Sequence, residues 1–95
     1  MPGDVDPPDD PYEQASRCIS IIERALAETG AALDDVVRTR IYVTRAGDIE
    51  DVGRAHAEAF GSARPATTGI VTELLDPRWR VEIEAEAVIG SGSAA

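Results

Sequence analysis

The spacing of apolar residues after Pro11 predicts an amphipathic helix. Proline is favoured at a first helical position, and Asp9 or Asp10 can cap it. The apolar residues then recur on one face at helical spacing, with charged residues opposite: Ala15, Cys18, Ile21, Ile22, Ala25 and Leu26. We expect Gly30 to end this helix and Cys18 to be an inert core thiol.

Side chains in the next segment, Val36–Thr44, sort onto two alternating faces, which predicts a strand. One side carries Thr39, Ile41 and Val43, and the other carries Arg38, Arg40 and Tyr42. A second helix is expected between Gly47–Asp48 and Gly61. Its apolar side carries Ile49, Val52, His56, Ala59 and Phe60. We expect His56 to be a hydrogen-bonded core or interface residue rather than a catalytic base.

Two further strands are expected, at Ala66–Leu74 and Arg80–Ile89, with a turn at Asp76–Pro77 between them. The last strand alternates between Val81, Ile83, Ala85, Ala87 and Ile89 on one face and Glu82, Glu84 and Glu86 on the other. The resulting order predicts one α/β (α+β) domain at 11–89, with a three-stranded sheet, two helices and parallel crossovers.

The two ends of the chain differ in composition from this domain. Residues 1–10 are rich in proline and aspartate and predict a disordered or extended leader, and 90–95 predict a flexible tail. Three strands offer little sheet surface for two helices. We therefore expect the missing surface to come from another subunit, or the natural start to lie upstream of Met1, where a strand or hairpin would complete the sheet.

The charge balance restricts the classes of partner. The net charge of −9 and the pI near 4.4 oppose binding to a nucleic-acid backbone. All basic residues are arginine, so a Schiff-base or P-loop lysine is excluded within this sequence. One cysteine and one histidine argue against a structural metal site. No apolar run can span a membrane and no signal pattern is present, so we expect a cytoplasmic protein.

Three glutamates share one face of the last predicted strand and would repel each other unless they are paired or solvated. Arg38 and Arg40 lie on the polar side of the first strand and are the obvious partners. One interpretation is a solvated cross-strand ladder of ion pairs. The other is a charged pocket between subunits, where a carboxylate handles the proton of a water molecule.

Three blocks of the sequence resemble the RidA/YjgF family of imine and enamine deaminases. These are AETGAALDDVVRTRIYVT, then GRAHAEAFGSARPATT, then VEIEAEAV, in the family's order and spacing from Pro11 to Val88. The resemblance implies a chorismate-mutase-like fold that assembles as a homotrimer. It also implies small-molecule sites in the clefts between subunits and chemistry that needs no metal or organic cofactor.

The resemblance also assigns candidate site residues. Glu82 matches a glutamate that positions the attacking water, which makes it the candidate catalytic residue. The arginine that holds the substrate carboxylate is replaced by Thr67, a frequent cysteine by Gly69, and an asparagine of the second helix by Gly53. The family's N-terminal β-hairpin has no match in this sequence.

From these matches we expect a substrate-binding group at Thr67, Thr68 and Gly69, with Arg64 nearby. A threonine hydroxyl lacks the two-pronged, charge-assisted contact that arginine makes with a carboxylate. If the protein is an enzyme, we expect cofactor-free hydrolysis of an imine or enamine to a carbonyl compound and ammonia. The alternative is a non-catalytic ligand-binding or interaction trimer. Ribonuclease activity is a third hypothesis, which the negative charge disfavours.

Overall fold

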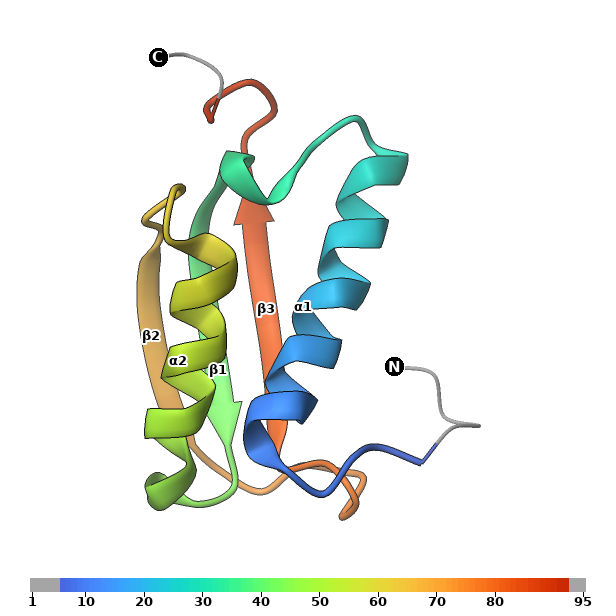
Figure 1. Ribbon diagram of the computed structural model, residues 1–95, viewed down its shortest axis with the longest axis vertical. Coiled ribbons are helices and arrows are strands. Elements are labelled where there is room, and N and C mark those ends of the chain that lie inside the picture. The colour runs from blue at the N-terminus through green and yellow to red at the C-terminus, as the bar shows by residue number, and fades with distance from the viewer. Residues whose placement is uncertain (1–5, 93–95) are drawn as a thin grey trace.

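The computed structural model describes residues 6–92 of the 95-residue chain. Its regular elements follow in the order α1 (Pro11–Glu28), β1 (Val36–Val43), α2 (Ile49–Phe60), β2 (Ala66–Val71) and β3 (Val81–Ala87), as Figure 1 shows. Short 3-10 turns precede β1 and α2, at Leu33–Asp35 and Ala46–Asp48. The predicted order of elements is confirmed. Within the described residues, no helix is both long and apolar enough to cross a membrane.

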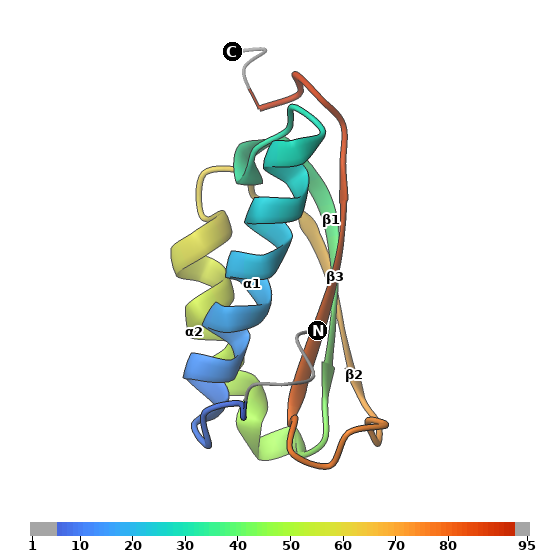
Figure 2. The same ribbon diagram turned by 90° about the vertical axis from the view of Figure 1, so that its right-hand side faces the viewer.

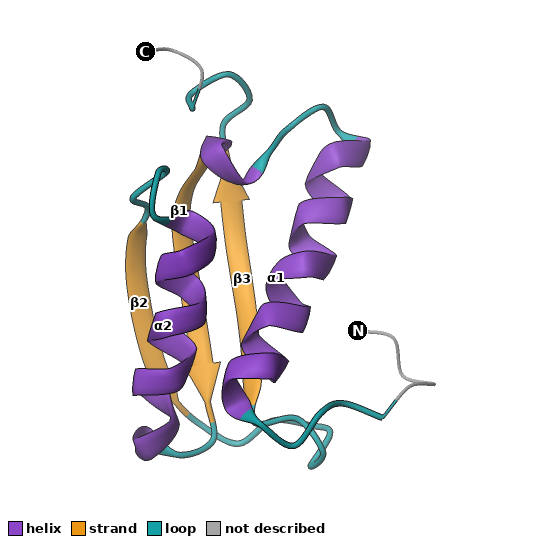
Figure 3. Ribbon diagram, viewed as in Figure 1, coloured by secondary structure: helices purple, strands orange, loops and turns teal. Residues whose placement is uncertain are grey.

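The three strands form one mixed sheet in the order β2-β1-β3 (Figure 3). Strand β1 pairs with β2 in parallel, and α2 makes the crossover between them. Strand β3 pairs with the other edge of β1 in the antiparallel sense. The central strand is therefore β1. Strands β2 and β3, which follow each other in the sequence, lie on opposite edges of the sheet.

Both helices pack on the same face of the sheet, and the other face carries no element of the described chain (Figure 2). We call this second side the open face. The register arranges its side chains in three cross-strand rows. These rows are Ala66–Arg38–Glu86, Thr68–Arg40–Glu84 and Ile70–Tyr42–Glu82. The arginines and glutamates that the sequence placed on polar faces thus meet on one surface.

Helix α1 begins and ends where the sequence predicts. The Asp10 carboxylate accepts a hydrogen bond from the Glu13 backbone N–H at 3.0 Å, a cap that stabilises a helix by about 1 kcal/mol. Pro11 follows at the first helical position. At the other end Gly30 has φ +85°, a left-handed conformation that suits glycine after a helix.

The buried face of α1 differs in part from the predicted one. Ala15 and Cys18 are buried as expected, but Ile19 is also buried, whereas Ile21 is only half-buried and Ala25 is exposed. Helix α1 contacts both α2 and β3. Because α1 packs against two elements, the positions of both decide which of its apolar residues are buried. Helical periodicity alone does not specify those positions.

The core lies between the helices and the inner face of the sheet. It is built from Ala15, Cys18, Ile19, Val36, Ile41, Val43, Val52, Ala55, Phe60, Trp79, Val81 and Ile83. On α2 the predicted Val52 and Phe60 are buried, while Ile49 at the start of the helix is 42% exposed. Burying each large aliphatic or aromatic side chain contributes roughly 1.5–3 kcal/mol.

Two strands are shorter than predicted. Strand β2 ends at Val71 rather than Leu74, and β3 ends at Ala87 rather than Ile89. Ala87 pairs with Val36, the first residue of β1, so the sheet offers no partner strand beyond it. Ile89 was expected on the inner face but is 64% exposed for this reason.

The leader and the tail contact the domain where the structure describes them. The Pro8 carbonyl accepts a hydrogen bond from the Gln14 side chain at 2.7 Å. The Gly92 backbone N–H donates to the Asp35 carboxylate at 3.0 Å. A side chain at Gly92 would come within 2.3 Å of the Asp34 carbonyl oxygen, so glycine is required there. The predictions for residues 1–5 and 93–95 lie outside the described residues.

Candidate functional site

The structure separates the residues that the sequence analysis grouped around Thr67. Thr67 and Gly69 pair with Thr39 and Ile41, whose side chains are buried. Their side-chain positions therefore lie on the face of the sheet that the helices cover. Thr68 pairs with Arg40 and faces the opposite way, onto the open face. The three consecutive residues therefore belong to two surfaces, as alternation along a strand requires.

Thr67 lies in a small cluster of hydroxyl groups and imidazole under α2. Its Oγ1 is 2.9 Å from Oγ1 of Thr39, which is in turn 2.8 Å from Nε2 of His56. Thr67 is exposed, His56 is half-buried, and Thr39 is only 1% exposed. Contacts of this kind satisfy a buried hydroxyl, as expected of a polar side chain on the core side.

The sole histidine is also packed against an aromatic ring. The centroids of the His56 and Phe60 rings lie 4.7 Å apart. Burial lowers the pKa of His56 below its usual value because it penalises the charged imidazolium. His56 is thus hydrogen-bonded and half-buried, in agreement with the structural interpretation of this residue.

Arg64 lies in the turn between α2 and β2, two residues before the strand begins. It has φ +50°, an uncommon conformation for a residue other than glycine, and its N–H donates to the Phe60 carbonyl at 2.9 Å. It lines an open hollow together with Val36 and Ser91, which belong to the start of β1 and to the tail. Arg64 therefore lies at the end of the sheet opposite to Glu82.

Glu82 borders a different hollow, of about 330 Å³, at the other end of the open face. Its lining consists of Tyr42, Thr72, Glu73, Leu74, Leu75, Asp76, Trp79 and Glu82. We call it the Glu82 hollow. Glu82 is exposed, and its side chain forms no hydrogen bond or ion pair with any residue between 6 and 92. Its carboxylate is therefore available to a water molecule or a ligand.

The neighbouring glutamates are engaged, which confirms two pairs of the expected ladder. Arg38 binds Glu86 at 2.6 Å, and Arg40 lies 3.6 Å from Glu84. The Tyr42 hydroxyl donates to Glu84 on the diagonal rather than to Glu82, which is its direct partner across the strands. Exposed ion pairs of this kind contribute about 0–1 kcal/mol each.

The two halves of the predicted site thus lie on the two outer strands. Thr67 is on β2 and Glu82 is on β3, with β1 between them. Two strand spacings amount to about 10 Å, and Thr67 is also displaced along the strand by three residues, about another 10 Å. A ligand of a few atoms cannot touch both residues within a single chain.

Sequence reasoning missed the Glu82 hollow because most of its lining comes from the irregular segment between β2 and β3. The pairing of Arg38 and Arg40 leaves Glu82 opposite Tyr42, a detail that depends on register. The cluster of Thr39, His56 and Thr67 was also missed. The only available signal was a polar residue, Thr39, on an otherwise apolar strand face.

Comparison with known sequences identifies relatives of this chain. The sequence model described as endoribonuclease L-PSP matches residues 1–89. An uncharacterised protein of Streptomyces coelicolor is 41% identical over 83 residues, which are 86% of this chain and 62% of that protein. A RutC family protein of Pyrococcus abyssi is 33% identical over 75 residues, 79% of this chain and 59% of that protein. The chain thus spans about three fifths of these relatives.

Solved structures show the same arrangement of elements. A member of the YjgF/YER057c/UK114 family from Mycobacterium tuberculosis superposes with a TM-score of 0.83 at 48% identity, over 86% of this chain and 70% of that one. A YjgF family protein from Neisseria meningitidis gives 0.82 at 30% identity, with the same coverage of both chains. The chorismate-mutase-like fold expected from the sequence is consistent with these structures.

Proposed function

Because this chain belongs to the endoribonuclease L-PSP family, also named YjgF, RutC or RidA, we propose that it is a cofactor-independent imine or enamine deaminase. The observation that carries this proposal is the position of Glu82. Its free carboxylate borders a hollow with an aromatic and aliphatic wall. Such a wall shelters a small organic molecule, while the carboxylate reaches the water at its edge.

The chemistry requires one base and one water molecule. Glu82 orients the water and accepts its proton as the oxygen adds to the imine carbon. Glu82 passes this proton to the imine nitrogen, which gives the carbinolamine. The carbinolamine hydroxyl then gives up its proton, by way of Glu82, to the amine nitrogen as the carbon–nitrogen bond breaks and ammonia leaves. The carbonyl compound remains and Glu82 returns to its ionised form. An enamine enters the same route after a proton is added to its β-carbon.

We propose that the complete site lies between subunits of a homotrimer. Thr67 and Glu82 lie on opposite outer strands, so two copies of the chain can bring together what one copy keeps apart. All six residues of β2 are exposed in the single chain, including Ile70 and Val71. An exposed edge strand with apolar side chains is a surface that proteins normally cover.

Thr67 restricts the substrates that fit this proposal. Its hydroxyl contacts Thr39 and offers no positive charge to a substrate carboxylate. A charge-assisted bidentate contact is about twice as strong as a neutral hydrogen bond. We therefore expect imines without a carboxylate to be turned over better than imines derived from amino acids.

The direct test is release of ammonia from imines generated in place by an oxidase. One substrate is 2-iminopropionate, and the other is a carboxylate-free imine formed from a simple primary amine. We expect acceleration over buffer, larger for the carboxylate-free imine, and loss of this acceleration in Glu82→Gln. Glu86→Gln is the matched control, since Glu86 lies on the same strand face but is paired with Arg38.

Oligomeric state is measured in the same preparation by light scattering. If a trimer forms and neither imine is hydrolysed faster than in buffer, the deaminase proposal is wrong. The alternative is a ligand-binding or interaction trimer without catalysis. Thr67→Arg distinguishes the two, because gain of activity toward 2-iminopropionate would show that the catalytic scaffold is intact and that the natural substrate differs.

The name of the family model refers to RNA cleavage. The net charge of −9 opposes binding to a phosphate backbone, and the two arginines on the open face are already paired with glutamates. RNA cleavage that Glu82→Ala abolishes, in a preparation free of contaminating nuclease, would favour that activity over deamination.

A further inference from the structure

The segment between β2 and β3 forms most of the Glu82 hollow although it has no helix or strand of its own. Six of the eight lining residues belong to it, from Thr72 to Trp79. Its first residue is held by a hydrogen bond from the Thr72 N–H to the Val43 carbonyl at 2.9 Å. Further along, the Trp79 N–H donates to the Asp76 carbonyl and the Thr44 N–H to the Arg80 carbonyl, both at 3.0 Å, and side-chain contacts supply the remaining hydrogen bonds of the segment.

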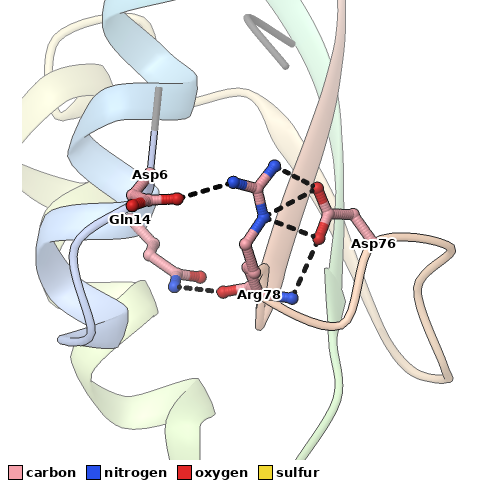
Figure 4. A network of polar contacts seen from close by, with 4 residues as sticks. All are labelled: Asp6, Gln14, Asp76 and Arg78. Atoms are coloured by element: carbon pink, nitrogen blue, oxygen red, sulfur yellow. Dashed lines mark hydrogen bonds and ion pairs between the residues drawn. The ribbon is translucent and has the colours of Figure 1, made fainter. Parts of the chain in front are cut away.

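Arg78 makes the main contacts that close this segment into a turn. Its guanidinium donates to both oxygens of Asp76, from Nη2 to Oδ2 at 2.8 Å and from Nε to Oδ1 at 3.1 Å (Figure 4). Its backbone N–H donates to the same carboxylate at 3.0 Å. These hydrogen bonds hold the pKa of Asp76 below its usual value.

The turn is also fastened to the rest of the chain. Nη1 of Arg78 donates to Asp6 of the leader at 2.7 Å. The buried side-chain amide of Gln14 donates to the Arg78 carbonyl at 3.1 Å and accepts from the Arg80 N–H at 2.6 Å. Arg78 thus links the leader, the turn and, through Gln14, helix α1, as Figure 4 shows.

The turn carries Trp79 into the core. The Trp79 N–H donates to the Asp76 carbonyl at 3.0 Å, and its side chain is 2% exposed while still lining the hollow. Glu82, three positions further along the chain, lines the same hollow. The position of the indole wall relative to the carboxylate therefore depends on the turn that Arg78 closes.

We propose that Arg78 is the positioning residue of the Glu82 hollow. By binding Asp76 on one side and Asp6 on the other, it fixes the turn that carries Leu74 and Trp79, the two apolar lining residues of the hollow that are not exposed. This role rests on the proposed function only in assigning the hollow to the substrate. Arg78 touches no reacting atom in this scheme, so its loss acts through the fit of the substrate.

The single tryptophan of the chain tests the positioning directly. We expect Arg78→Gln to shift Trp79 fluorescence to longer wavelength and to increase its quenching by acrylamide. Arg78→Lys keeps the charge but not the planar fork, so it should give an intermediate result. Asp6→Asn should give a smaller change of the same sign. The matched control is Arg54→Gln, because Arg54 pairs with Asp51 at 3.5 Å on α2, outside the hollow.

The kinetic test uses the carboxylate-free imine. We expect Arg78→Gln to raise KM by about tenfold with kcat changed by less than about threefold. A misplaced binding wall weakens the binding of the substrate more than it slows the chemical step. Partial recovery of KM in Arg78→Lys supports positioning. Unchanged Trp79 fluorescence and KM in Arg78→Gln would overturn the proposal.

Failure of this proposal is distinguishable from failure of the proposed function. If the unmodified protein hydrolyses neither imine, the deaminase assignment falls and the kinetic role of Arg78 falls with it. The fluorescence comparison still decides whether Arg78 holds the wall. If Arg78→Gln unfolds, the same two measurements on Arg78→Lys decide, with native-like values in that variant counting against the proposal.

Discussion

Arg80 binds Asp48 through two hydrogen bonds, from Nη2 to Oδ1 at 2.7 Å and from Nε to Oδ2 at 3.0 Å. The pair joins the turn before α2 to the residue before β3. The Asp48 side chain is 9% exposed and the Arg80 side chain 29%, so both are partly removed from water. This geometry distinguishes the pair from the exposed ladder on the open face.

Asp48→Ala is therefore expected to lower the free energy of unfolding by about 2–3 kcal/mol, because a half-buried guanidinium loses its carboxylate partner and keeps only the Asp9 carbonyl. Urea denaturation followed by circular dichroism measures the change. The control is Asp51→Ala, which removes an exposed pair with Arg54 and should cost less than about 1 kcal/mol. Equal losses in the two variants would contradict the structural role assigned to Asp48.

Gln14→Leu should also destabilise the protein, by about 2 kcal/mol or more. Gln14 is 1% exposed and satisfies the carbonyls of Pro8 and Arg78 and the N–H of Arg80. Leucine keeps the volume but leaves these groups without their partner. Chemical denaturation compares it with Ser20→Ala, an exposed position on the same helix, and similar stability of both variants would refute the prediction.

Cys18 should be unreactive in the folded protein. Its side chain is buried, and burial raises the pKa of the thiol to about 11. Because thiol reagents attack the thiolate, Ellman's reagent at pH 8 should modify the native protein at least about a hundredfold more slowly than the urea-unfolded chain. Comparable rates would show that Cys18 is accessible and ionised.

The same pKa predicts the direction of alkaline destabilisation. The folded pKa of Cys18 lies above the unfolded value of about 8.5, so the unfolded chain loses its thiol proton first. The contribution of Cys18 is fully present below about pH 8.5 and is lost as the pH rises toward 11. Cys18→Ala should flatten this part of the stability profile, and an unchanged slope between these pH values would exclude the assignment.

His56 predicts an opposite dependence in mild acid. Burial lowers its folded pKa below the unfolded value of about 6.5, so the unfolded chain takes up the proton first as the pH falls. Its contribution to stability is present above about pH 6.5 and is lost below it. Because the chain has one histidine, its proton NMR titration gives this pKa without assignment. A value at or above 6.5 would contradict the prediction.

Local patterns were sufficient for the elements and for most of the faces. Pro11 and Gly30 mark α1 because they act on the backbone of their own turn, and alternation sorts Arg38 from Thr39 because neighbours on a strand face opposite ways. The ends of β2 and β3 were misplaced, because a strand ends where its partner ends. Ala87 has Val36 opposite, and Ile89 has no strand residue to pair with.

The candidate site was predicted less completely than the fold. The resemblance singled out Glu82 and Thr67, and both are exposed side chains in the structure. Their separation across the sheet, the hollow beside Glu82 and the role of Arg78 all depend on which strands are neighbours and on the path of an irregular segment. Neither property has a periodicity that can be read along the chain.

The sequence by itself determined the order of helices and strands, the acidic charge and the absence of lysine, because these follow from composition and from contacts between near neighbours. Glu82 became a candidate through the resemblance of the sequence to a known family. Only the tertiary structure decided that Thr67 and Glu82 lie on opposite edges of the sheet and that Arg78 joins the leader to the wall of the hollow. The order β2-β1-β3 results from pairing between residues far apart in the chain, which local spacing does not encode.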